Sequence, residues 1–152
     1  MSNTSRLCNV ETVQIWRLGK EPQRPYSLHW ALYVETSPGI GNTYQIMGTS
    51  DNYAIDIRRN RPLENDWSKR IIMGTVTLEE IDEMERILTT VDIMHNVPNW
   101  NGNDWFMSAL VSLSRSELTG MMPKARLAWE RYCGGICGWQ MCMCSDHPPR
   151  AR

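Results

Sequence analysis

Residues 28–34 read Leu-His-Trp-Ala-Leu-Tyr-Val, and this stretch decides the fold. Its apolar side chains occupy both odd and even positions, which is typical of a strand that is buried on both faces of a sheet. We therefore expect a central strand over His29 to Val34, with other strands along its edges. His29 stands at the head of this strand.

Four other segments have the composition of strands, and turn-forming residues separate them. Tyr53 to Arg58 alternates between apolar and polar side chains, which fits a strand with one wet face. Ser37-Pro38-Gly39 and Gly41-Asn42 predict a hairpin connection. The expected strands are 13–18, 29–34, 43–47, 53–58 and 70–76, with a charged loop over 59–68.

Helices are expected after the strands. Thr77 followed three residues later by Glu80 forms a capping box, and Asn101 or Asn103 can cap a second helix. Pro123 suits the first turn of a third helix that runs to about residue 132. Apolar residues recur at helical spacing: Leu78, Ile81, Met84, Leu88 and Val91 in the first helix, and Phe106, Ala109, Leu110 and Leu113 in the second.

Strands followed by helices predict an α+β fold, in which an antiparallel β-sheet, a meander, packs against helices. A chain of 152 residues is expected to form a single domain over 1–152, ending in a Cys- and Pro-rich tail over 133–152. With 16 basic and 17 acidic residues, the charge favours neither nucleic acid nor an anionic membrane as a partner. No apolar run reaches the length of a transmembrane helix.

The N-terminal segment is polar and lacks the apolar core of a signal peptide, which predicts a cytoplasmic protein. The five cysteines are then expected to be reduced thiols. Cys133, Cys137, Cys142, Cys144 and His147 have spacings unlike those of structural zinc sites, so we expect no metal and no other cofactor.

His29 and Gly102 occupy positions that matter in thiol hydrolases. A nucleophilic Cys benefits from a helix N-terminus, because the dipole and the free N–H groups favour the thiolate. A His on a neighbouring strand then acts as the base, and a polar group orients that His. Gly102 stands at the start of the second expected helix, and Gln45 on the next strand is a candidate for orienting His29.

At these residues the chain resembles the NlpC/P60 superfamily in its circularly permuted, papain-like form, the branch that includes the lecithin:retinol acyltransferase-like proteins. It is more similar still to small, mostly fungal, uncharacterised proteins with the motifs Arg-Pro-x-His-Trp-Ala-Leu, Tyr-His and Trp-Asn-Cys-Gln-x-Trp-Val-x-x-Ala-Leu. The matching stretches here are residues 24–32, Tyr44-Gln45 and residues 100–110, within a resemblance over about residues 13–120.

Two departures from this pattern matter. Gly102 stands where the family pattern has the nucleophilic Cys, and Gln45 stands where it commonly has a second His. Of the triad that the resemblance implies, only His29 carries over. Acyl-enzyme chemistry is not available at position 102, because glycine offers no nucleophilic atom.

The candidate catalytic residues are therefore His29, Gln45 and Asp104, the last as an acid/base group beside His29. Each candidate also has a structural interpretation. His29 can be a sheet histidine that bonds a carbonyl, Asp104 can complement the helix dipole, and tryptophans can pack in the core. The candidate ligand-binding residues are Trp30, Trp100, Asn101, Gly102, Asn103 and Trp105.

Three functional hypotheses follow. The first is a repurposed papain-like scaffold that uses the cleft between His29 and Gly102 for small-molecule binding and non-covalent acid/base chemistry (isomerisation, cyclisation or elimination) in a biosynthetic pathway. The second is a non-catalytic ligand-binding or protein-interaction module, whose helix N-terminus favours a carboxylate or acyl ligand. The third is a thiol hydrolase or acyltransferase, if Gly102 replaces a native Cys.

Overall fold

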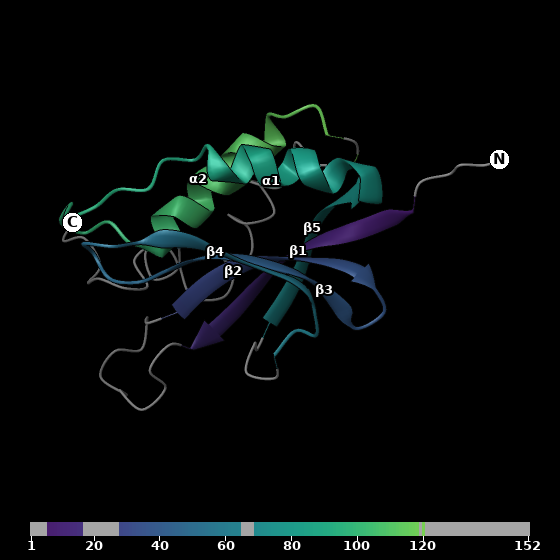
Figure 1. Cartoon of the computed structure of the whole chain (residues 1–152), viewed down its shortest axis with the longest axis horizontal. Helices are drawn as coiled ribbons and strands as arrows, with labels where there is room; N and C mark the ends of the chain where they lie inside the picture. The colour runs from purple at the N-terminus through teal and green to yellow at the C-terminus, as the bar shows by residue number, and fades with distance from the viewer. Residues whose placement is uncertain (1–5, 17–27, 65–68, 119, 121–152) are drawn as a thin grey trace.

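The structure is a computed structural model in which residues 6–16, 28–64, 69–118 and 120 are described. Within this part of the chain, five strands form one antiparallel sheet and two helices lie on one of its faces (Figure 1). The strands are β1 (Leu7–Trp16), β2 (Leu28–Ser37), β3 (Ile40–Met47), β4 (Ala54–Arg61) and β5 (Lys69–Thr77). The 3₁₀ turn η1 (Leu78–Glu80) precedes the helices α1 (Ile81–Thr89) and α2 (Gly102–Ser114). The α+β class is as the sequence predicts.

The strand order is β4-β3-β2-β1-β5, so β2 lies in the middle of the sheet as expected. Strands β1 to β4 form a meander, but β5 crosses back and pairs with β1. A pure meander was therefore wrong for the last strand. The physical reason lies in β1, whose residues Val10 to Gln14 are all buried, so that its second edge needs a partner for its backbone groups.

Several strand boundaries differ from those expected. β1 begins at Leu7, six residues before the predicted start, and β4 continues to Arg61 into the predicted charged loop. Gly41 and Asn42 belong to β3 and not to the turn, because their backbones pair with β2. A Cβ at Gly41 would meet the carbonyl oxygen of Val34, so this close approach of two strands requires glycine. Ladder pairing thus extends the strands through residues of low strand propensity.

The capping box before the first helix is present as predicted. The Glu80 carboxylate accepts a hydrogen bond from the Thr77 backbone N–H at 2.9 Å. Leu78 is 42% exposed, so its place on the buried helix face was wrong. Leu78 lies in the 3₁₀ turn η1. Because a 3₁₀ turn has three residues per turn and not 3.6, its side chain is not in line with the buried apolar residues of α1. The third expected helix and the tail over 133–152 lie outside the described residues.

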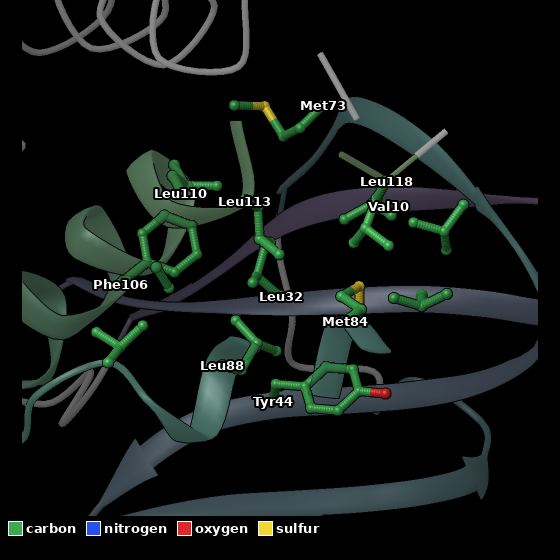
Figure 2. Packing of buried hydrophobic residues seen from close by; sticks show 14 of the residues in the cluster. Val10, Leu32, Tyr44, Met73, Met84, Leu88, Phe106, Leu110, Leu113 and Leu118 are labelled. Atoms are coloured by element: carbon green, nitrogen blue, oxygen red, sulfur yellow. The ribbon is translucent and has the colours of Figure 1, made fainter. Parts of the chain in front are cut away.

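The main core lies between the helices and one face of the sheet (Figure 2). Leu32 of β2 and Tyr44 of β3 point towards Met84 and Leu88 of α1 and towards α2. Burying side chains of this size contributes about 1.5–3 kcal/mol each. Alternate residues of β2 face the other way: Ala31 and Tyr33 form a second buried cluster with Val13.

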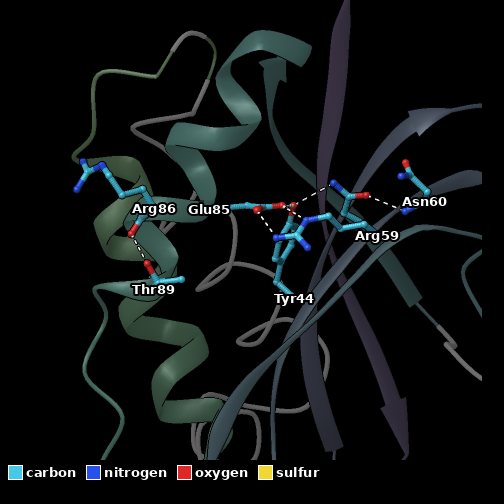
Figure 3. A network of polar contacts seen from close by, with 7 residues as sticks. Tyr44, Arg59, Asn60, Glu85, Arg86 and Thr89 are labelled. Atoms are coloured by element: carbon cyan, nitrogen blue, oxygen red, sulfur yellow. Dashed lines mark hydrogen bonds and ion pairs between the residues drawn. The ribbon is translucent and has the colours of Figure 1, made fainter.

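A polar network that runs from buried Tyr44 to the surface ties α1 to the sheet (Figure 3). The Tyr44 hydroxyl donates to a carboxylate oxygen of Glu85 at 2.7 Å, and Asn42 Nδ2 donates to that hydroxyl at 3.1 Å. The Arg59 guanidinium binds both carboxylate oxygens of Glu85, at 3.1 and 2.7 Å. The Asn60 backbone N–H donates to Asn42. The network therefore links α1 with both β3 and β4.

Burial and the neighbouring Glu85 raise the pKa of Tyr44 well above its ordinary value. Burial would raise the pKa of Glu85 too, but hydrogen bonds from Arg59 and Tyr44 outweigh it and lower that pKa below its usual value. The native state therefore keeps the phenol protonated and the carboxylate ionised.

None of the helices in the described ranges is long and apolar enough to span a bilayer.

We expect Tyr44→Phe to lower the free energy of unfolding at pH 7 by about 1.5–3 kcal/mol, because it removes a part-buried hydrogen bond to a charged group. The unfolded chain ionises Tyr44 near pH 10, whereas the native state holds its proton. Wild-type stability should therefore fall as pH rises above about 10, and the gap between the two proteins should narrow. Urea unfolding of both proteins, at pH 7 and above about pH 10, measures this difference in stability. A difference that stays the same at the two pH values would contradict the raised pKa of Tyr44.

Candidate functional site

The N-terminus of α2 is closed by its own side chains. The side-chain oxygen of Asn101, the N-cap residue, accepts from the Asn103 backbone N–H at 2.7 Å. The Asp104 carboxylate accepts from the Asn101 backbone N–H at 2.8 Å, which completes a capping box. Of the two caps predicted, Asn101 is therefore the one used. Asp104 places its negative charge at the positive end of the helix dipole.

This helix start is joined to the end of β2. Asn103 Oδ1 accepts a hydrogen bond from the Trp30 backbone N–H at 3.2 Å. The register of the β2–β3 ladder runs from the hairpin as far as Leu32 and Tyr44, before Trp30 is reached. A side chain of α2 thus satisfies a backbone donor of β2 beyond the end of this ladder. Asn103 and Trp30 are 3% and 1% exposed, so the contact is shielded from water.

Gly102 lies against β3. A Cβ built at this position would lie 3.1 Å from the Ile46 Cβ and 3.6 Å from the Ile46 carbonyl oxygen. This contact is tight but does not overlap, so a small side chain needs Ile46 to shift by a few tenths of an ångström. Gly102 is itself buried, as are its neighbours Asn101 and Asn103.

The structure brings His29 and Gln45 together. The His29 Nε2 atom lies 2.7 Å from the Gln45 Oε1 atom, and the two residues are 5% and 6% exposed. His29 follows the alternation of Ala31 and Tyr33, so its imidazole belongs to the sheet face opposite the helices. Gln45 lies on that face too, because Tyr44 and Ile46 on either side belong to the main core.

Gln45 is held in turn by an ion pair on β4. Its Nε2 atom donates to Asp56 Oδ2 at 3.3 Å, and the two residues are direct partners in the β3–β4 ladder. Arg58 Nε donates to the same carboxylate oxygen at 2.9 Å and also pairs with Glu64 at 3.3 Å. A chain of polar contacts therefore runs from His29 across three strands to the surface.

The direction of these hydrogen bonds fixes the tautomer of His29. Because the amide nitrogen of Gln45 donates to Asp56, its oxygen faces the imidazole, and an amide oxygen only accepts. His29 Nε2 must then carry the hydrogen. In the neutral ring the lone pair is on Nδ1, which is the nitrogen able to accept a proton.

A small polar hollow lies beside Gln45 on this face. It has a volume of about 20 Å³, which is room for roughly one water molecule. Its walls combine two cations, a carboxylate, two neutral polar side chains and a proline: Arg58, Arg61, Glu64, Thr43, Gln45 and Pro62. The hollow adjoins Gln45, the residue that contacts the His29 imidazole, and Gly102 is not among its lining residues.

The aromatic candidates have different environments. Trp30 is 1% exposed and stacks on Phe106 with ring centroids 6.0 Å apart, and Trp105 is also 1% exposed. Both belong to the main core. Trp100 is half-buried and meets the Tyr53 ring edge-on at 5.5 Å. Of the three, only Trp100 keeps part of its surface open to a ligand.

Sequence reasoning did not single out Asp56 and Arg58. The alternation over 53–58 places both residues on the wet face of a strand. That Gln45 lies opposite Asp56 depends on the register between β3 and β4, which the local sequence does not show. Asp104 was considered as an acid/base group, and its observed contact is with the Asn101 backbone. In the described part of the chain, no group of three or more His, Cys, Asp or Glu side chains could hold a metal ion. The C-terminal cysteines lie outside that part.

Residues 15–120 match a family of unknown function (DUF6540), which is more than half of the chain, so the protein belongs to this family. Neither a curated protein nor a solved structure matches the chain.

We expect Asn103→Ala to lower the free energy of unfolding by about 1–3 kcal/mol, because the buried Trp30 N–H loses its acceptor. Asn101→Ala removes the N-cap and should cost about 1 kcal/mol. Ser108→Ala, at an exposed position of α2, is the matched control and should leave stability unchanged or slightly higher. Urea unfolding compares all three. Asn103→Ala behaving like Ser108→Ala would show that the helix start is not anchored through Trp30.

Proposed function

We propose that this protein is a papain-like scaffold without its Cys nucleophile, in which His29 acts as a non-covalent acid and base on a small molecule. The observation that carries the proposal is the 2.7 Å contact between the His29 imidazole and Gln45, continued by Asp56. The resemblance to permuted thiol hydrolases, a reduced intracellular setting and a biosynthetic role belong to the same proposal.

The chemistry follows from the tautomer. Neutral His29 takes a proton from the substrate on Nδ1 while Gln45 keeps the hydrogen on Nε2 in place. The resulting imidazolium returns the proton to another atom of the substrate, or to the leaving group. Isomerisation, cyclisation and elimination can all proceed in this way, without an acyl-enzyme intermediate. Gly102 is compatible with such reactions, because none of them needs a thiol.

A second candidate is a non-catalytic module that binds a small ligand. Two observations favour it: position 102 has no nucleophile, and the side chains of Arg58 and Arg61 line the hollow beside Gln45. The Asp104 carboxylate at the α2 N-terminus disfavours a carboxylate ligand at that point. A ligand of this module would therefore contact the His29 face of the sheet, with its charged group near Arg58 or Arg61.

A ligand screen with the full chain separates the two candidates. Uniformly labelled wild-type protein is mixed with small-molecule pools, and shifts of the His29 ring signals in NMR spectra identify binders. Mass spectrometry then follows each binder for conversion. We expect at least one binder to be converted by the wild type and not by His29→Gln. Binding without conversion would favour the module, and no binder near His29 would contradict both candidates.

Restoring the thiol tests whether the site has the geometry of a thiol hydrolase. The His29 imidazole and Gly102 belong to opposite faces of the sheet, so we expect the introduced thiol of Gly102→Cys to react with iodoacetamide no faster than an ordinary cysteine, whose pKa is about 8.5. The same thiol in a His29→Ala background should react at the same rate. Labelling is measured peptide by peptide.

Two controls accompany this experiment. Gly102→Ala measures the cost of the contact with Ile46, which lies 3.1 Å from the new Cβ. Burial raises the pKa of the Cys8 thiol, so Cys8 serves as a slow internal reference. A thiol at position 102 that reacts at least one pH unit below the usual thiol pKa, and only when His29 is present, would show that the two positions form a dyad and would contradict their placement on opposite faces.

A further inference from the structure

We propose that Asp56 is a positioning residue of the His29 site and that it acts through the Gln45 amide. This inference rests on the proposed acid/base function and identifies what decides which ring nitrogen of His29 is basic. Asp56 lies on the edge strand β4, and its side chain is 32% exposed. Nothing in its immediate sequence marks it as part of a site.

The argument begins with the two orientations open to a glutamine amide. In the observed orientation, Gln45 Nε2 lies 3.3 Å from Asp56 Oδ2 and Gln45 Oε1 lies 2.7 Å from His29 Nε2. A flipped amide would set its oxygen against the carboxylate, leaving two acceptors facing each other without a hydrogen between them. Asp56 therefore selects the orientation that presents an acceptor to His29.

The register between β3 and β4 keeps Asp56 beside the Gln45 amide. Gln45 and Asp56 are opposite one another in the β3–β4 ladder, so the backbone itself sets their side chains side by side. Arg58 lies two residues further along β4, on the same face, and its Nε atom donates to the same Asp56 oxygen at 2.9 Å. Arg58 thereby holds the carboxylate, the carboxylate holds the amide, and the amide sets the tautomer.

The tautomer of His29 can be read directly, without a substrate. The full chain is labelled with ¹⁵N-histidine, and long-range ¹H–¹⁵N correlation spectra are recorded at about pH 8, above the ordinary imidazole pKa. We expect the wild type to show the Nε2–H tautomer of His29. In Asp56→Ala both amide orientations become possible, so the ratio of Nε2–H to Nδ1–H should fall about tenfold.

Asp56→Asn is the conservative control. Arg58 still donates to the side-chain oxygen at position 56, so that oxygen stays turned towards Gln45 and the wild-type tautomer should remain. Combining Asp56→Asn with Arg58→Met frees the new amide to flip, and the second tautomer should then appear. This double variant keeps the size of the side chain at position 56, which serves the test if Asp56→Ala fails to fold.

His95 is an internal reference in the same spectra. Its Nε2 atom lies 2.8 Å from the Tyr53 carbonyl oxygen, which accepts from it, so its tautomer should be the same in every variant. A purely structural role for Asp56 would change stability and leave the His29 tautomer as in the wild type. That result, in a folded Asp56→Ala or in the double variant, would overturn the inference.

The two proposals fail separately. If the tautomer follows Asp56 as expected but no compound is converted in a His29-dependent way, the positioning role stands and the acid/base function is overturned. If compounds are converted and depend on His29, but the tautomer is insensitive to Asp56, the function stands and the positioning role is overturned.

Discussion

Burial of β2 on both faces is the constraint on which the rest of this structure depends. Its even-numbered residues Trp30 and Leu32 enter the core beneath the helices, while Ala31 and Tyr33 are buried on the other face. Strand geometry alternates side chains strictly, so neighbouring residues of β2 serve two different surroundings. His29 and Trp30 differ in this way. The His29 imidazole contacts Gln45 on the face away from the helices, while Trp30 belongs to the core beneath the helices and its backbone N–H binds Asn103 of α2.

Neighbouring residues of β3 also face opposite sides of the sheet. Gln45 faces the imidazole, while Ile46, one residue further, lies against Gly102. β2 and β3 therefore hold the His29–Gln45 pair on one face of the sheet and the N-terminus of α2 on the other. The helix is fixed by an asparagine contact to a β2 backbone N–H and by close approach to β3. Positioning of His29 therefore depends on the same two strands that position α2.

The amino-acid sequence predicted much of this arrangement where local physics decides. Both helix starts followed from capping residues, since a cap acts on donors only two or three residues away. The central place of β2 followed from its two apolar faces. The sequence also predicted that Gln45, on the next strand, orients His29, and the structure brings the two side chains together. In contrast, the extent of β1 and β4 and the return of β5 to β1 could not be read from local pattern, because pairing partners far along the chain extend strands.

By itself, the sequence determined the class of fold, the helix caps and the absence of a nucleophilic side chain at position 102, because these depend on residue type and short spacing. Only the tertiary structure decided that Asp56 lies beside Gln45 and that Asp104 serves the helix cap. Register explains the difference. A shift of one residue between two strands would turn Asp56 to the other face, and that register is set by the packing of the whole sheet and not by any segment alone.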